Sequence, residues 1–228
     1  MNFNKFSILI LSLYFCLLFF ILLSINLIFF EGIPHVPDDV AYLFMGKMFA
    51  SGHIIANIPI PNQFVDYFSE VLTVNKGAWL FQYPYGHPLL LAIGVLLGFP
   101  NIIPPLIGTL CIFILFFIAR EVYDKKTALF LLPLPLLSPF FLENASSFMS
   151  HNTAAFYLVL SIFFIIKFNK KGGRLSLLYA GILIGLLFNT RPLTSLPFLL
   201  IEATIILLQK NFISGIFGFL YLVSFYYS

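Results

Sequence analysis

The chain has 228 residues, of which 61% are hydrophobic and only 9% are charged, and its formal net charge at pH 7 is +3. A soluble domain carries roughly 25% charged residues and cannot hide this much apolar surface in one core. The composition therefore excludes a soluble globular protein and predicts that most of the chain lies in lipid. The small positive charge does not indicate nucleic-acid binding, because the uneven distribution of loop charges across a membrane explains it.

The first predicted element is a membrane span within residues 1–30. An apolar run from Phe6 to Phe30 follows Lys5. This run exceeds the roughly 7–15 residues of a signal-peptide core, and no small-residue cleavage pattern follows it. Its length suits the ~20 residues that a bilayer needs, so we expect an uncleaved first transmembrane helix.

Residues 31–86 are predicted to form a large loop outside the membrane. The segment is mixed in character and contains five prolines and five acidic residues. Within it, apolar residues recur at helical spacing from Asp39 to Ser51, and Gly52 is a helix stop signal. This pattern is typical of a short amphipathic helix on the membrane surface, with Asp38 as its N-cap.

Residues 87–228 are predicted to complete a helical bundle, which makes 1–228 a single transmembrane domain. The apolar segments are 88–99, 102–119, 128–142, 153–166, 175–188, 193–208 and 212–228. If 88–99 is a surface or re-entrant helix, the positive-inside rule is satisfied throughout. Nine cations then lie on the cytoplasmic side (Lys5, Arg120, Lys125, Lys126, Lys167, Lys170, Lys171, Arg174, Lys210) and six acids on the other (Glu31, Asp38, Asp39, Asp66, Glu70, Glu143).

This threading predicts an all-α membrane protein of about seven transmembrane helices, with short juxtamembrane helices in its large first outer loop. It predicts a multi-pass protein of the plasma membrane whose N-terminus lies in the cytoplasm. The chain stops at Ser228 inside an apolar segment without a polar tail. We therefore expect a chain that is truncated at its C-terminus.

The motif HVPDDVAY, residues 35–42, contains the strongest candidates for chemistry. The adjacent carboxylates of Asp38 and Asp39 follow the first span at the start of a predicted helix. One interpretation is helix capping and a favourable interaction with the helix dipole. Another is that a carboxylate acts as a general base, or binds a divalent cation that holds a phosphate. His35 and Tyr42 are further candidates within this motif.

Three later motifs contain polar residues that are expected at the same membrane face. The turn YPYGHP, residues 83–88, supplies Tyr83, Tyr85 and His87, which fit either a rigid interfacial turn or a lipid-phosphate site. The segment SSFMSHN, residues 146–152, ends in His151 and Asn152.

The third motif is NTRP, residues 189–192. Arg191 beside a membrane helix is costly unless a phosphate or carboxylate pairs with it. Glu202 lies within the following predicted span, where a carboxylate is likewise costly unless it is paired or protonated.

These motifs, in this order, resemble those of the multi-spanning C-type glycosyltransferases, in particular the protein O-mannosyltransferase and aminoarabinose-transferase group. The likeness consists of the acidic pair, the Tyr-Pro-x-Gly-His-Pro turn, the Ser-Pro and Ser-His loop, and a spaced-glycine run that ends in Thr-Arg-Pro at 190–192. It covers almost the whole chain. Three features depart from the family pattern. Asp39 stands where glutamate is usual, and His151 or Asn152 stands where some members carry a second acid. Tyr83 stands near the position where some relatives carry a lysine, so His87 or Arg191 would have to neutralise the phosphate.

The resemblance implies transfer of a sugar from a polyprenyl-phosphate donor to a protein, lipid or glycan acceptor on the non-cytoplasmic face. It makes Asp38 and Asp39 the catalytic pair. Tyr83, Tyr85, His87, His151 and Arg191 become candidates for binding the donor phosphate or substrate. The cofactor implied is at most a divalent cation, with Asp38 as its ligand. The alternatives are a multi-pass transporter or permease and a catalytically degenerate membrane scaffold.

Overall fold

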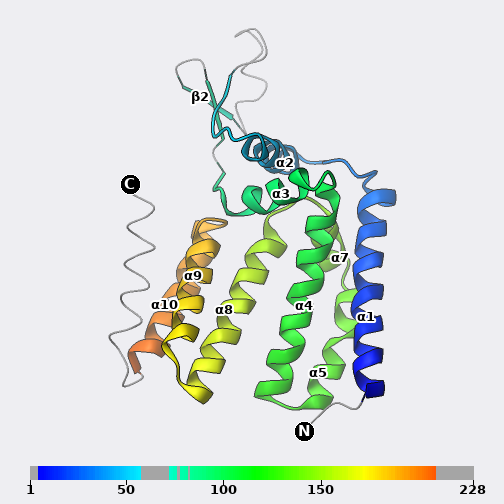
Figure 1. The fold of residues 1–228 in the computed structure, drawn as a ribbon, viewed down its shortest axis with the longest axis vertical. Helices are drawn as coiled ribbons and strands as arrows, with labels where there is room; N and C mark the ends of the chain where they lie inside the picture. The colour runs from blue at the N-terminus through cyan, green and yellow to red at the C-terminus, as the bar shows by residue number, and fades with distance from the viewer. Residues whose placement is uncertain (1–4, 58–71, 76–77, 82, 209–228) are drawn as a thin grey trace.

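The computed structural model describes residues 5–57, 72–75, 78–81 and 83–208 of the chain. Long helices run side by side between two ends of the molecule, and shorter elements cover one of these ends (Figure 1). The long helices are α1 (Lys5–Ser24), α4 (Ile103–Val122), α8 (His151–Lys171), α9 (Arg174–Phe188) and α10 (Pro192–Leu208). The covering helices are α2 (Pro37–Ala50) and α3 (Gly86–Leu96), and the end that they cover is called the α2 end.

Three helical stretches are long and apolar enough to cross a membrane, namely Ser7–Phe29, Pro100–Val122 and His151–Lys170. The first joins α1 to a π-helical turn, η1 (Ile25–Phe29), and the second joins a 3-10 turn, η3 (Pro100–Ile102), to α4. The apolar helices Arg174–Phe188 and Pro192–Ile205 are shorter. The described residues therefore confirm a membrane helix bundle but not seven spans, and the predicted span 212–228 lies outside them.

The predicted span 128–142 is not one straight helix. The chain there forms α5 (Lys125–Leu131), α6 (Pro133–Leu136) and α7 (Pro139–Ser146), and the path bends by 72°. The bend follows from Pro139, because the residue before a proline avoids the helical region. Ser138 is accordingly extended, and its hydroxyl caps α7 by accepting a hydrogen bond from the Phe141 N–H at 3.2 Å. Counted as one crossing, this bent pair gives up to four candidate spans.

Helices α2 and α3 pack against each other across the α2 end (Figure 1). Their crossing is close, because a Cβ at Gly46 would lie 3.0 Å from the Cβ of Leu91. The buried side of α2 therefore packs on α3, and the placement of this helix on the membrane surface stays a prediction. Helix α2 also begins two residues earlier than predicted: Val36 is the N-cap, Pro37 occupies the first turn, and Asp38 does not cap the helix.

The large loop contains strands, which the sequence analysis did not predict. Strands β1 (Ala56–Asn57), β2 (Leu72–Asn75) and β3 (Ala78–Phe81) form an antiparallel sheet in the order β1-β3-β2. Asn75 pairs with Ala78 and Leu72 with Phe81, so β2 and β3 form a hairpin. Among the described residues of this loop, the predicted short helices are represented by α2, and α3 follows the sheet.

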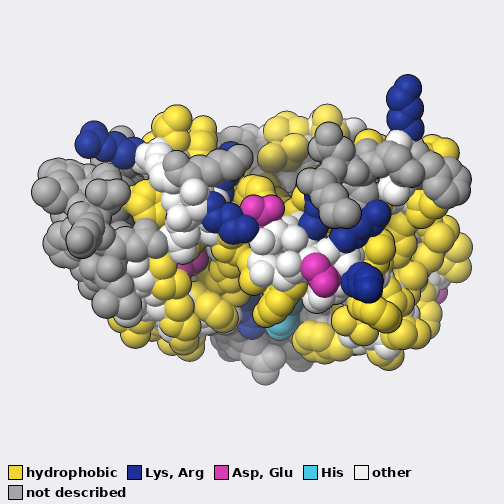
Figure 2. Space-filling view, turned by 90° about the horizontal axis from the view of Figure 1, so that it is seen from below, with side chains coloured by type: hydrophobic (Ala, Val, Ile, Leu, Met, Phe, Trp, Pro, Cys, Tyr) yellow, Lys and Arg dark blue, Asp and Glu magenta, His cyan; other side chains and the backbone are white. Residues whose placement is uncertain are grey.

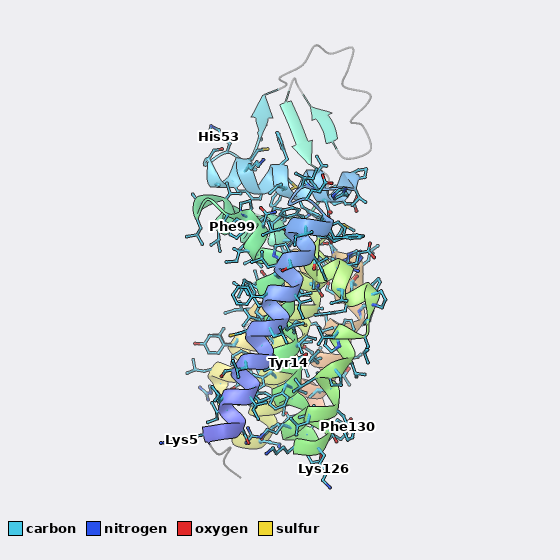
Figure 3. All side chains as sticks on the ribbon, turned by 90° about the vertical axis from the view of Figure 1, so that its right-hand side faces the viewer. Lys5, Tyr14, His53, Phe99, Lys126 and Phe130 are labelled. Carbon is cyan, nitrogen blue, oxygen red and sulfur yellow. The ribbon has the colours of Figure 1, made fainter. Side chains whose placement is uncertain are left out.

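Cations gather at the end opposite the α2 end, which is called the basic end. Helix α1 starts there at Lys5 and α5 at Lys125, and Figure 3 shows Lys5 and Lys126 far from His53 and Phe99. Helix α4 ends there after Arg120, and α9 starts there at Arg174. Figure 2 shows Lys and Arg side chains spread over this face. The charge segregation that the sequence predicts is therefore present along the bundle axis.

Candidate functional site

The two adjacent carboxylates of α2 have different surroundings at the α2 end. The hydroxyl of Tyr83 donates a 2.6 Å hydrogen bond to Oδ1 of Asp38. Asp39 is 3% exposed, and its Oδ1 has no hydrogen-bond partner among the described residues. Consecutive helical residues point in different directions, so one carboxylate lies at the surface of the cluster while the other is enclosed.

Burial raises the pKa of Asp39 to about 6, and the neighbouring charge of Asp38 adds to this rise. Hydrogen bonds from the backbone of His35 and Phe148 oppose the rise, as does the nearby His35 ring. A carboxyl group in an apolar setting prefers its neutral form, because removing water from the charged form costs free energy. The fold therefore raises the proton affinity of Asp39.

Two tyrosines connect the acidic pair to the bundle. The rings of Tyr42 and Tyr83 pack with their centroids 4.9 Å apart. Ser150, in the turn before α8, donates a 3.1 Å hydrogen bond to the hydroxyl of Tyr42. The pKa of Tyr42 is raised, first by burial and further by both aspartates, while the charge of Arg191 lowers it. Tyr42 therefore lies within electrostatic reach of the acidic pair and of Arg191.

His87 is enclosed within the protein. It is 1% exposed, its Nε2 lies 2.6 Å from the carbonyl oxygen of Phe148, and its Nδ1 lies 2.8 Å from Oγ1 of Thr153. Since a carbonyl only accepts, Nε2 carries the proton and Nδ1 accepts from the threonine. Burial lowers the pKa of His87 to about 4, so the ring is neutral. Both ring nitrogens have partners within the protein, so His87 links α3 to Thr153 of α8 and to Phe148 in the turn before it, and a contact of His87 with the donor phosphate stays a prediction.

The cationic side of the cluster is formed by the turn between α9 and α10. Arg191 is partly buried there, and its backbone N–H donates a 2.8 Å bond to the carbonyl of Leu187. The charges of Arg191 and Asp38 both act on His151 at the start of α8. Nδ1 of His151 and Nδ2 of Asn152 are buried and lack a hydrogen-bond partner among the described residues. These unpaired groups border the same cluster.

The remaining candidates lie at the margin of the cluster or away from it. His35 is exposed and its Nε2 contacts the carbonyl of Phe30 at 2.9 Å. Tyr85 is exposed and packs its ring edge-on against Phe49. Glu202 lies ten residues along α10 from Pro192, roughly 15 Å at 1.5 Å per residue. Its oxygens lie 2.8 and 2.9 Å from the hydroxyl of Ser161 on α8, so it belongs to the bundle core.

The structure adds residues to which the sequence analysis assigned no role. Ser150 bonds Tyr42, and Asn189 receives hydrogen bonds from the turn that carries Tyr83. Both residues lie inside motifs that the sequence analysis singled out, but nothing in their type distinguishes them from loop residues. Across the described part of the chain, no group of three His, Cys, Asp or Glu side chains could hold a metal ion. A divalent cation bound by Asp38 stays a prediction.

The family comparison concerns the part of the chain that follows the acidic pair. A model of the family described as dolichyl-phosphate-mannose-protein mannosyltransferase matches residues 84–227. This range contains His87, His151 and Arg191 but not Asp38 or Asp39. A search of curated proteins and a search of solved structures gave no match. The family match extends over more than half of a chain whose long helices are apolar enough to cross a membrane. The chain therefore belongs to the dolichyl-phosphate-mannose-protein mannosyltransferase family, whose members are membrane glycosyltransferases.

Proposed function

We propose that the protein moves a sugar from a polyprenyl-phosphate donor to an acceptor hydroxyl on the non-cytoplasmic face of the plasma membrane. The observation that carries the proposal is the cluster at the α2 end, where Tyr83 donates a 2.6 Å hydrogen bond to Asp38 and the turn that carries Arg191 accepts a 2.8 Å hydrogen bond from Gly86, three residues after Tyr83. A general base and a phosphate-binding cation in one cluster fit a transfer that starts from a sugar phosphate. The family match supports the same chemistry.

In the proposed reaction, Asp38 removes the proton from the acceptor hydroxyl as its oxygen attacks the anomeric carbon of the donor sugar. The bond between the anomeric carbon and the phosphate oxygen breaks, and polyprenyl phosphate leaves with the electron pair. Arg191 stabilises the charge on the departing phosphate. The hydroxyl of Tyr83 orients the carboxylate of Asp38 through their 2.6 Å hydrogen bond.

The position of the cluster suits a donor that is anchored in lipid. A polyprenyl tail stays in the hydrocarbon while its phosphate lies at the interface, and the cluster lies at one end of the helix bundle (Figure 1). Because Lys5, Lys125 and Arg174 begin helices at the basic end, the positive-inside rule favours a cytoplasmic N-terminus and an outward-facing cluster. The proposal includes the predicted topology of seven transmembrane spans, of which the last is expected within residues 212–228.

The experiment that tests the proposal is a transfer assay with the full chain in proteoliposomes. The probe donor is dolichyl-phosphate mannose with a radiolabelled sugar, and the label is followed into protein, lipid and glycan fractions. Asp38→Asn keeps the shape of the side chain and removes the base. We expect it to lower the transfer rate about 100-fold or more, within the range for losing a general base.

The matched control is Asp124→Asn, which makes the same chemical change at an exposed acid of the basic end. Asp124 caps α5 by accepting from the Thr127 N–H at 2.7 Å, and asparagine caps a helix equally well. The control should keep the wild-type rate. Full transfer activity in Asp38→Asn would remove the catalytic role of Asp38.

A further inference from the structure

The turn before α3 is docked onto the turn between α9 and α10 at one point. The N–H of Gly86 donates a 2.8 Å hydrogen bond to the backbone oxygen of Asn189. The N–H of Tyr85 donates to the side-chain Oδ1 of the same residue at 3.3 Å. A Cβ at position 86 would overlap Oγ1 of Thr190 and lie 2.8 Å from the Asn189 oxygen, so the approach requires glycine.

The α9–α10 side of this contact is held firmly by its own helix. Thr190 is 2% exposed, and its hydroxyl donates a 2.8 Å bond to the carbonyl of Leu186. The backbone N–H groups of Asn189 and Thr190 donate to Gly185 and Leu187 at 2.9 and 3.0 Å. Asn189 is therefore presented on a fixed helix terminus, and Arg191 follows it directly in the chain.

The α3 side is fixed as well. His87 follows Gly86 and is bound to Phe148 and Thr153 through its two ring nitrogens. Tyr83, which holds Asp38, precedes Gly86 by three residues. The docking point thus joins the segment that orients the acid to the segment that carries the cation.

We propose that Gly86 and Asn189 form a clamp that sets the position of Arg191 relative to Asp38. Asn189 is then a positioning residue. Its backbone oxygen accepts from the Gly86 N–H and its side-chain oxygen from the Tyr85 N–H, which fixes the position of the α9–α10 turn relative to α3. The catalytic consequence rests on the proposed function, whereas the geometric role of the clamp does not. Small displacements of a charge-stabilising group cost large factors in rate, because the transition state tolerates little misplacement.

The test measures the geometry and the activity separately. Spin labels are attached at Val40 on α2 and Leu193 on α10, which are 50% and 84% exposed. Electron–electron double resonance then measures the distance between the two labels. Cys16 and Cys111 are first replaced by serine and alanine. We expect Gly86→Ala and Asn189→Ala to shift or broaden this distance distribution, and Asn189→Asp, which keeps an acceptor oxygen, to preserve it.

The matched control is Gly94→Ala on the same helix. A Cβ there would lie 2.6 Å from Cγ1 of Ile103 and 2.8 Å from Cα of Pro100, a similar crowding on the side of α3 that faces α4. This variant should destabilise the protein but leave the Val40–Leu193 distance unchanged. In the transfer assay, Gly86→Ala and Asn189→Ala should lower kcat about tenfold or more while the donor KM changes less than about threefold.

An unchanged distance distribution in Gly86→Ala would overturn the clamp. Alanine at position 189 keeps the backbone oxygen that accepts from Gly86 and removes only the acceptor of the Tyr85 N–H, so an unchanged distribution in Asn189→Ala would overturn the positioning role of the Asn189 side chain even if Gly86→Ala does not fold. Equal shifts in Gly94→Ala and Gly86→Ala would also overturn the clamp, because general destabilisation would then explain both. A shifted distance in a protein that shows no transfer, even as wild type, would leave the clamp standing and remove the proposed function.

Discussion

The hydroxyl of Tyr83 makes one contact whose removal tests how the acid is held. Tyr83→Phe loses the 2.6 Å bond to Asp38 but keeps the ring that packs on Tyr42. We expect the transfer rate to fall about tenfold, equivalent to roughly 1.4 kcal/mol, because a hydrogen bond to a charged group is lost. The control is Tyr123→Phe, at a side chain that is 74% exposed beyond α4. Equal rates for Tyr83→Phe and wild type would show that Asp38 needs no orientation from Tyr83.

Asp39 should make the stability of the protein depend on pH. Its carboxyl has a pKa of about 6 in the folded protein against 3.8 ordinarily. Between these values the unfolded chain loses the proton that the folded protein keeps, so the free energy of unfolding falls as pH rises. The contribution of Asp39 is complete below about pH 3.8 and is lost as pH passes through about 6.

Thermal unfolding in detergent between pH 4 and 7 measures this effect. Asp39→Asn, which cannot titrate, should flatten the decrease in Tm over this interval. Asp124→Asn serves again as the control, since Asp124 is exposed at the other end of the bundle. If wild type and Asp39→Asn show parallel Tm curves, the carboxyl of Asp39 does not keep its proton in the folded protein.

The sequence identified the acidic pair but not the difference between its members. Adjacent aspartates at the start of a helix are visible in the sequence, whereas their hydrogen-bond partners Tyr83 and Phe148 follow 45 or more residues later along the chain. His87 illustrates the same limit. Its place in a conspicuous turn suggested a phosphate ligand, while its partners come from the start of α8 and the turn before it.

Among the helices and strands, the membrane spans that correspond to long apolar runs are the elements that the sequence predicts best. The runs 6–30 and 102–119 correspond closely to Ser7–Phe29 and Pro100–Val122. The apolar run 128–142 predicts one span, whereas it contains three prolines, Pro133, Pro135 and Pro139, and forms the bent path of α5 to α7. The β2–β3 hairpin was missed although only Lys76 and Gly77 separate its strands, and glycine in a two-residue connection is a hairpin signal.

A buried polar pair holds α10 against its neighbours. Ser161 of α8 is fully buried and contacts both the carboxyl of Glu202 and the carbonyl of Ala180 on α9. Ser161→Ala removes this hydroxyl and leaves the buried carboxyl without it, which should cost about 1–3 kcal/mol of stability. Thermal unfolding in detergent should show a lower Tm for Ser161→Ala than for the control Thr204→Val, whose hydroxyl bonds only within exposed α10 surface. Equal Tm values would show that this contact does not stabilise the bundle.

For the whole molecule, the charge distribution was predictable because it depends only on the order of apolar and charged segments. The sequence placed Lys5, Arg120 and Arg174 on one side and the acidic pair on the other, and the structure separates them along the bundle axis. The assembly of the cluster was not predictable to the same degree. It depends on the docking of Asn189 against Gly86, a contact between positions that are 103 residues apart.

The orientation of this axis in the membrane can be tested with single cysteines. In a chain with Cys16→Ser and Cys111→Ala, His53→Cys places a thiol beyond α2 and Lys126→Cys places one at the basic end, both at exposed positions (Figure 3). Because cations favour the cytoplasmic side, a membrane-impermeant maleimide should label His53→Cys in intact cells. Lys126→Cys should react only after the membrane is permeabilised. Labelling of Lys126→Cys in intact cells would reverse the orientation and place the cluster of Asp38 and Arg191 in the cytoplasm, where an outward-facing acceptor could not reach it.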